Sequence, residues 1–423
     1  MKKCFRVFSI GMLCILTASV SFAQIGIFEA NVDVDNGSLG AEGSASYDPA
    51  TDMYTINGSG QDVWSDVGSN FQFVYREWTG DFDLRADVTI DGGLETQSWI
   101  KSMLMCAEST EGWSNYITTR VRRDGQFSSQ WRADGEGSDG STPGDLRVSG
   151  LNPARQRLVR IGNTFSTYYM NETGEWTLID SNEVELAETV LVGMGVCAHD
   201  LGELATGTFS KVALGAPVDG MFDMSIDIDS GNLGAAGSSA YDAASDTYTL
   251  TGSGDDIWGS ADNCQFLYKE ISGDFVIEGT IKADAGTSTS EWVKTGLMAR
   301  DNLNPGSANA GIIRRPDGLI NTQWRLEAGA DSYSAGDDLR VTIADEDIQM
   351  KLVRSGDTFM GYYKKASDAD FTFQIEIDVI MTDPILVGLA VTAHETGSVA
   401  SGQFMGITIS AGASAAENWE LLK

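Results

Sequence analysis

A long segment of this chain occurs twice, and this duplication constrains the fold more than any other feature. Gly58–Trp64 (GSGQDVW) returns as Gly252–Trp258 (GSGDDIW), and Gln130–Arg132 (QWR) returns as Gln323–Arg325. The matching strings keep an offset of about 194 residues, far longer than the roughly 20–50 residues of a solenoid repeat. A unit of this length can bury its own core. The sequence therefore predicts two copies of one globular domain, and a feature present in both copies is set by their shared fold.

The N-terminus has the pattern of a secretory signal peptide. Lys2, Lys3 and Arg6 precede an apolar stretch too short to span a bilayer, and small residues flank a cleavage site after Ala23. We expect residues 1–23 to be removed and the protein to be secreted, periplasmic or attached to the cell surface. No other apolar run approaches the length of a membrane-spanning helix, so we expect no spanning segment. The expected units are a first domain over 24–214, a linker over 215–220, a second domain over 221–410 and a tail over 411–423.

The charge of the chain excludes two classes of partner. The formal net charge is −33, and removal of the three basic residues of the signal peptide makes it more negative. Such a surface repels nucleic acid and anionic membranes. The charge itself mainly indicates solubility.

Three cysteines remain beyond the expected signal peptide: Cys106, Cys197 and Cys264. Their counterparts in the other copy are Ala299, Thr392 and Phe71. The fold therefore does not require cysteine at these positions, and we expect buried free thiols rather than a disulfide framework. No CxxC or clustered Cys/His pattern predicts a metal cluster.

The local pattern is that of many short strands. Phe82–Val88 alternates apolar and charged residues with period two, and Asp124-Gly125 and Asp317-Gly318 are hairpin signals at matching places. The chain has 48 glycines and no convincing amphipathic helix. We predict an all-β protein made of two tandem antiparallel β-sandwiches of the jelly-roll type.

The strings from Tyr241 to Trp258, with Ser272–Phe275 and Val387–His394, resemble a known superfamily. The chain is similar to the concanavalin A-like lectins and glucanases, in the branch that resembles the regulation-of-enolase protein. The resemblance covers both copies nearly end to end. It implies the concanavalin A-like sandwich fold. Its implication for function is broader, because the superfamily contains lectins, glycosidases and adhesion modules.

An enzyme on this fold needs a pair of carboxylates beside a glycosidic bond. Glu183, Glu185 and Glu188 have a spacing similar to the glucanase branch, but the central acid is Ile380 in the second copy. An exposed acidic loop explains this segment better, so we expect no catalysis. A glycoside hydrolase or lyase remains the first alternative.

The two histidines of the chain, His199 and His394, occupy matching positions after buried-looking strands. One interpretation is a general base or a ligand contact. The other is a structural imidazole bonded to neighbouring backbone, which a position shared by both copies favours.

Paired aromatic residues are the best candidates for a sugar site. Trp131-Arg132 matches Trp324-Arg325, and a stacking ring beside a hydrogen-bonding guanidinium is typical of such sites. The alternative is that these tryptophans belong to the sandwich core. Trp99 and Trp292 also match, as do Trp64 and Trp258, for which a core position is favoured.

A D-x-D-x-G pattern occurs at Asp33 and again at Asp227. It is compatible with Ca²⁺ ligation, but it lacks the distant bidentate glutamate of an EF-hand loop. A solvent-facing strand edge is the favoured interpretation, and we expect no cofactor.

These observations predict an exported, non-catalytic protein that binds carbohydrate or another cell-surface polymer. The second alternative is a structural or adhesive envelope protein. The predicted ligand contacts are Trp131, Arg132, Trp324, Arg325, His199 and His394.

Overall fold

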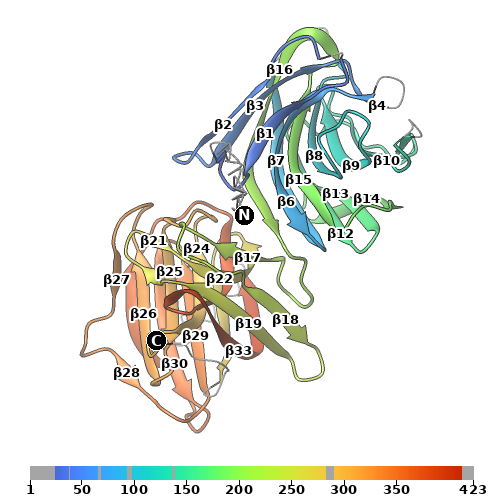
Figure 1. Cartoon of the computed structure of the whole chain (residues 1–423). Helices are drawn as coiled ribbons and strands as arrows, with labels where there is room; N and C mark the ends of the chain where they lie inside the picture. The colour runs from blue at the N-terminus through green and yellow to red at the C-terminus, as the bar shows by residue number, and fades with distance from the viewer. Residues whose placement is uncertain are drawn as a thin grey trace, which may run out of the picture.

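The computed structural model describes residues 24–37, 39–64, 68–92, 98–135, 139–282 and 290–411. All regular elements in these ranges are β-strands, and their pairings are antiparallel (Figure 1). Within the described ranges, no helix could cross a membrane. The expected signal peptide and the tail beyond residue 411 lie outside the described residues. The prediction of an all-β fold is confirmed.

The first sandwich comprises β1 to β16 and has a front and a back sheet. The order of the front sheet is β1(Ala30–Val34), β6(Phe71–Thr79), β15(Thr189–Cys197), β8(Lys101–Ala107), β9(Tyr116–Arg122), β10(Phe127–Arg132), β11(Asp139–Ser141). The order of the back sheet is β14(Trp176–Glu183), β13(Thr164–Met170), β12(Ala154–Ile161), β7(Phe82–Gly92), β16(Asp200–Gly215), β3(Met53–Gly60), β2(Ser44–Asp48). A two-stranded hairpin, β4(Val63–Trp64) with β5(Gly68–Ser69), stands apart from both sheets.

The second sandwich comprises β17 to β33 and repeats this strand order. Its front sheet is β17(Met224–Ile228), β22(Cys264–Ile271), β32(Ile385–Thr392), β24(Lys294–Arg300), β25(Asn309–Arg314), β26(Leu319–Arg325), β27(Ser332–Ser334), with β28(Val341–Thr342) paired to β26. Its back sheet is β18(Ser238–Asp242), β19(Thr247–Gly254), β33(Glu395–Ala411), β23(Phe275–Ile281), β29(Ile348–Ser355), β30(Thr358–Lys365), β31(Thr372–Asp378). The separate hairpin is β20(Ile257–Trp258) with β21(Ala261–Asp262).

Alternation along each strand separates two faces of the front sheet. In β8 of the first sandwich, Leu104 and Cys106 point into the core between the sheets, where they join back-sheet residues such as Leu84. Met103 and Met105 point the other way and form a second apolar cluster on the outer face. Successive side chains of a strand lie on opposite faces, so Lys101 shares the outer face with these methionines. This outer face carries the candidate site.

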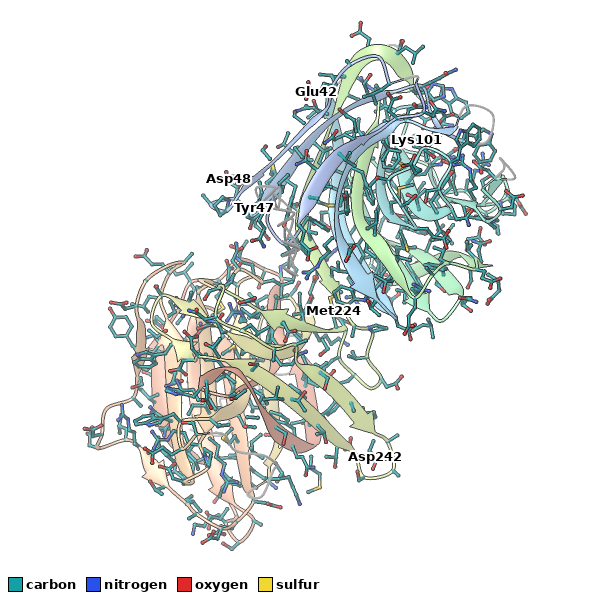
Figure 2. All side chains as sticks on the ribbon, viewed as in Figure 1. Glu42, Tyr47, Asp48, Lys101, Met224 and Asp242 are labelled. Carbon is teal, nitrogen blue, oxygen red and sulfur yellow. The ribbon has the colours of Figure 1, made fainter. Side chains whose placement is uncertain are left out.

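The two sandwiches contact each other through polar groups near their junction. The Tyr47 hydroxyl lies 2.9 Å from Asn304 Oδ1, and Arg85 donates a hydrogen bond to the Asp223 carbonyl. Figure 2 labels Tyr47 on the side of the first sandwich that faces the second, with Met224 close to the junction. Residues 216–223 connect β16 to β17, and a bridge joins Ala216 to Ser225. The chain therefore reverses direction directly at the contact between the sandwiches.

The three cysteines in the described part of the chain, Cys106, Cys197 and Cys264, are buried free thiols. Burial in apolar surroundings raises the pKa of each of these thiols. They are therefore protonated at neutral pH, as the sequence predicts for core thiols.

Candidate ligand-binding cleft

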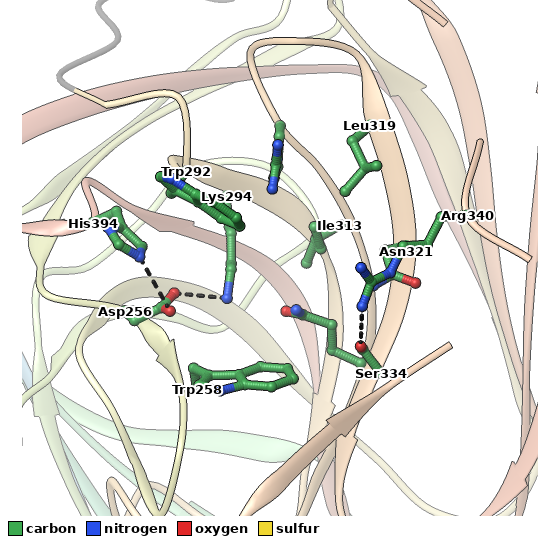
Figure 3. Close-up of a pocket in the computed structure, with 12 residues that line it drawn as sticks. Asp256, Trp258, Trp292, Lys294, Ile313, Leu319, Asn321, Ser334, Arg340 and His394 are labelled. Carbon is green, nitrogen blue, oxygen red and sulfur yellow. Dashed lines mark hydrogen bonds and ion pairs between the residues drawn. The ribbon is translucent and has the colours of Figure 1, made fainter. Parts of the chain in front are cut away.

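A cleft of about 460 Å³ opens on the outer face of the second front sheet (Figure 3). Its walls come from both hairpin and sheet residues. The lining residues are Asp256, Trp258, Trp292, Lys294, Ile313, Arg315, Leu319, Asn321, Gln323, Ser334, Arg340 and His394.

The topology brings these residues together from segments far apart in the chain. Leu319, Asn321 and Gln323 are alternate residues of β26, so they form one row on the outer face. Lys294 begins β24, and His394 lies two residues after the end of β32. The hairpin of β20 and β21 closes the other side. The site therefore exists only when the front sheet and this hairpin are assembled.

An ion pair forms the floor of the cleft. Lys294 Nζ lies 2.7 Å from Asp256 Oδ1, and His394 Nε2 lies 3.5 Å from the other carboxylate oxygen. Lys294 also donates a hydrogen bond of 3.0 Å to the Ile257 carbonyl. Burial lowers the pKa of Lys294, and the charge of Asp256 partly offsets this shift. The pair fixes the orientation of the hairpin and of the histidine.

Two partly exposed tryptophans flank this ion pair. Trp292 is 46% exposed and Trp258 is 39% exposed, and Figure 3 shows them on opposite sides of Lys294 and Asp256. The Arg315 guanidinium stacks 4.1 Å from the Trp292 ring centre, and the His394 ring lies 6.0 Å from it. A stacked cation holds an aromatic ring in one orientation and leaves its other face exposed. The flat apolar face of a ligand can stack on such a ring.

Strand register identifies the matching positions in the first sandwich, because the pairings of β8, β9, β10 and β11 repeat those of β24 to β27. Nine of the twelve residue types are identical. The matching residues, in the same order, are Asp62, Trp64, Trp99, Lys101, Arg120, Arg122, Gln126, Ser128, Gln130, Ser141, Arg147 and His199.

The contacts are repeated as well. Lys101 forms an ion pair with Asp62, and His199 Nε2 lies 3.3 Å from Asp62 Oδ2. Burial by itself raises the pKa of Asp62, but the bonds from His199 and Lys101 hold this pKa well below its usual range. Arg122 stacks 3.9 Å from the centre of the Trp99 ring, which is also 46% exposed. The shared fold thus builds the same constellation twice.

Among the described residues, several buried polar atoms on this surface have no hydrogen-bond partner. In the first sandwich these are Arg120 Nε and Nη1, Gln126 Oε1, Ser128 Oγ and Gln130 Oε1, and in the second they are Asn321 Oδ1 and Gln323 Oε1. A buried polar group without a partner costs about 1–3 kcal/mol. A ligand that supplies hydroxyl or charged groups at these points would recover this cost.

Both histidines have an unusual backbone conformation. The φ angles of His199 and His394 are +56° and +55°, in the left-handed region that favours glycine. Such strain costs on the order of 1–3 kcal/mol and is concentrated at functional sites. Here the backbone turn places each imidazole between the carboxylate and the tryptophan. Both histidines thus lie in the cleft, where the sequence analysis placed ligand contacts as one of two interpretations.

Trp131 and Trp324 lie on the opposite side of the front sheet from the cleft. Each is half-buried and packs against the core of its sandwich. Their strand neighbours Gln130 and Gln323 face the cleft instead, because successive side chains alternate. The Trp131 ring lies directly against Gly140, where a Cβ atom would clash with it. The core interpretation of these tryptophans is thus the one that their position supports.

Arg132 and Arg325 are fully buried beneath the cleft. Arg132 forms an ion pair with Asp139 and donates a hydrogen bond of 3.1 Å to the Trp64 carbonyl. Arg325 pairs with Asp262 and donates to the Gly259 carbonyl. These guanidinium groups hold the hairpins that carry Trp64 and Trp258. We therefore replace the expected Trp-Arg site by the cleft, in which the arginines position the hairpin without facing a ligand.

The other candidates of the sequence analysis lie away from the cleft. Glu183, Glu185 and Glu188 are exposed at and after the end of β14. Asp33 and Asp227 accept hydrogen bonds from the Gly43 and Gly237 amides. Among the described residues, no group of three or more acids, histidines or cysteines could hold a metal ion.

Sequence reasoning missed most of the cleft. Asp62, Lys101, Gln130 and Arg147 were not singled out, although each has an identical counterpart in the second copy. Identity between copies was the available signal. This identity did not distinguish residues on the outer face of the front sheet from residues of the core, because residues of both kinds are identical between the two copies.

No family model matches the chain, and no curated protein matches it. Among solved structures, a functionally unknown protein from Saccharomyces cerevisiae is 16% identical, with a TM-score of 0.35 over 43% of this chain and 96% of that chain. The carbohydrate-binding module CBM66 from Bacillus subtilis is 13% identical, with a TM-score of 0.30 over 44% and 96%. A Lotus tetragonolobus seed lectin isoform is 10% identical, with a TM-score of 0.27 over 44% and 99%. These likenesses are too distant to assign a function, so we take the function from the cleft.

Proposed function

We propose that this chain is an exported, non-catalytic glycan-binding protein with one sugar site in each sandwich. The observation that carries the proposal is the duplicated set of residues that lines the cleft in the second sandwich. This set combines exposed tryptophan faces with buried polar atoms that lack partners among the described residues. A pyranose ring has an apolar face and a rim of hydroxyl groups. The apolar face fits Trp292 or Trp99, and the hydroxyls fit the unpartnered amide oxygens below.

Binding is favoured over hydrolysis by the composition of the cleft. Of the described residues that line it, Asp256 is the only carboxylate, and it is already paired with Lys294 and His394. Hydrolysis with two carboxylates requires a second acid about 5–10 Å away. The function we propose is therefore binding without catalysis. The proposed export of the protein rests on the predicted signal peptide over residues 1–23.

Two sites in one chain make binding to a polymer stronger than binding to a short oligosaccharide. When both sites engage one chain, the second binding event is intramolecular and raises the apparent affinity by about 10²–10⁴. Loss of either site removes this gain.

The test is a glycan array with the mature protein, followed by calorimetry on the best ligand. We expect Trp99→Ala and Trp292→Ala each to weaken oligosaccharide binding at the affected site by about tenfold, because each removes a stacking plate. Polymer binding should fall further. Phe373→Ala is the control, because Phe373 is 50% exposed but lies on β31 at the edge of the back sheet.

Two outcomes would contradict the proposal. One is the absence of glycan binding while the protein is folded, which would favour the structural or adhesive alternative. The other is an equal effect of Phe373→Ala and Trp292→Ala, which would place the ligand elsewhere.

A further inference from the structure

The two clefts differ at three of their twelve matching positions. Arg120 of the first sandwich corresponds to Ile313, Gln126 to Leu319 and Ser128 to Asn321. The first of these changes replaces an apolar side chain by a full positive charge. The strand order and the other nine matching residue types are the same in both copies, so the difference concerns what the cleft contacts.

Arg120 lacks the partners that a buried arginine normally has. It is 3% exposed, and its Nε and Nη1 atoms have no hydrogen-bond acceptor in the part of the chain that the structure describes. The other buried arginines of the first sandwich all have acceptors in the described part of the chain: Arg85 and Arg122 pair with Asp83 and Asp124, Arg132 with Asp139, and Arg160 with carbonyl groups. A buried guanidinium whose N–H groups lack acceptors is unfavourable, which makes Arg120 an exception that requires a reason.

Two further arginines lie near Arg120. Burial and the nearby charges of Arg122 and Arg147 together lower the pKa of Arg120 to about 10, while the charge of Asp62 opposes this shift. The guanidinium is still charged at neutral pH. An anion in the cleft would therefore gain chiefly from Arg120, because Arg122 already pairs with Asp124 and Arg147 donates to the Ser141 hydroxyl.

Neighbouring polar atoms define where such an anion belongs. Ser128 is the cross-strand partner of Arg120, and its Oγ is buried without a hydrogen-bond partner. Gln130, two residues further along β10, has an unpartnered Oε1 on the same face. A guanidinium and a hydroxyl side by side suit a carboxylate or sulfate group, which accepts from both.

We propose that the cleft of the first sandwich binds a sugar unit that carries a negative charge, a carboxylate or a sulfate ester, which pairs with Arg120. The second sandwich, with Ile313 at this position, binds a neutral unit of the same polymer or of another one. This assignment rests on the proposed glycan-binding function and gives the two sites different specificities.

The strongly acidic composition of the chain makes this preference testable. A net charge of −33 gives no long-range attraction for an acidic glycan, so a preference for the acidic form has to arise inside the cleft. Short oligosaccharides at physiological ionic strength keep the long-range repulsion small.

The experiment measures binding of matched probe pairs to the mature full-length protein by calorimetry. One pair is an oligogalacturonate and its methyl ester, and the other is a sulfated galacto-oligosaccharide and its desulfated form. The Trp292→Ala background suppresses the second site. We expect the acidic member of one pair to bind the first site about tenfold to hundredfold more tightly than its neutral form, as charge-assisted hydrogen bonds do. The pair that shows the preference tells whether the anion is a carboxylate or a sulfate.

Arg120→Ile installs the residue of the second copy and should abolish the preference for the acidic probe. In a chain that keeps Trp292, the same substitution should not weaken binding of the neutral probe at the second site. Ile313→Arg is the reciprocal variant and should create an acidic preference in the second sandwich. This second variant keeps the test conclusive if Arg120→Ile does not fold.

The outcomes separate this inference from the proposed function. Neutral glycans bound by both sites with no acidic preference, or a preference that survives Arg120→Ile, would overturn the inference alone. Failure of every probe and every array glycan to bind would overturn the proposed function and this assignment with it.

Discussion

The first and second sandwiches neutralise a matching buried arginine with carboxylates at different positions. Arg132 and Arg325 occupy matching buried positions below the two hairpins. Arg132 takes its carboxylate from Asp139 on β11, whereas Arg325 takes it from Asp262 on β21. The two acids approach their arginines from different neighbouring strands. The shared fold therefore requires a counter-ion for this arginine but does not fix which strand supplies it.

The exchange is reciprocal. The residue that matches Asp262 in the first sandwich is Ser69, and the residue that matches Asp139 in the second is Ser332. Both serine hydroxyls lie within 3.4 Å of their arginine. Between the two copies, the carboxylate and the serine thus exchange places, and a polar group is kept at both positions. Arg120, by contrast, forms no ion pair within the described part of the chain, which supports a role in contacting a ligand.

The largest effect should come from breaking this pairing. Asp139→Ser leaves the fully buried Arg132 without a carboxylate and should lower the free energy of unfolding by about 3–5 kcal/mol. Adding Ser69→Asp moves the counter-ion to the position used by the second sandwich and should restore most of this loss. Chemical denaturation of the three proteins measures both effects.

The second sandwich does not offer an equally clean version of this test, because Asp262 also pairs with Arg300. The position that matches Arg300 in the first sandwich is Ala107, so Asp139 can be tested without a second arginine. A double variant no more stable than Asp139→Ser would show that the position of the carboxylate matters, and not only its charge.

A smaller effect should separate the two faces of β10 and β26. Trp131→Ala and Trp324→Ala remove half-buried rings that pack on the core, and each should cost about 2–4 kcal/mol. Gln130→Ala and Gln323→Ala remove cleft residues and should weaken glycan binding with little loss of stability. Thermal melts and calorimetry on all four variants give the comparison. Reduced binding by a folded Trp131→Ala protein with unchanged stability would return the site to the tryptophan face.

The fold could be predicted from the sequence, but most of the cleft could not. The repeat and the alternating strands predicted the all-β sandwich because chain-wide periodicity is visible in one dimension. The string Gln-Trp-Arg showed that something was shared, but not which of its residues faces the core. Alternate residues of a strand face opposite sides of the sheet. Which of them face the core depends on how the front sheet packs against the back sheet. Lys101 and Asp62 are 39 residues apart in sequence, and only the strand order brings them into contact.

The smallest effect concerns Asp33 and Asp227, the matching acids of the D-x-D-x-G pattern. Burial raises the pKa of both, and that of Asp227 reaches about 6. The Gly237 amide and Arg76 of the first sandwich oppose this shift, while Asp229 adds to it. Between pH 4 and pH 6 the folded state therefore binds more protons here than the unfolded state. The stabilising contribution of Asp227 is complete below about pH 4 and is lost as the pH rises through about 6.

Asp227→Asn tests this contribution, because asparagine keeps an acceptor for the Gly237 amide but does not titrate. The free energy of unfolding of the unaltered protein should fall by about 1–2 kcal/mol more than that of the variant between pH 4 and pH 7. Asp33→Asn is the matched control in the first sandwich, and we expect it to change the pH profile less, because burial is the main cause of the shift at both sites and Asp33 is less deeply buried than Asp227. Equal changes in the two variants would contradict this, because they would show that the two copies desolvate this acid to the same extent. A larger change for Asp227→Asn would show that its deeper burial makes the two copies electrostatically different.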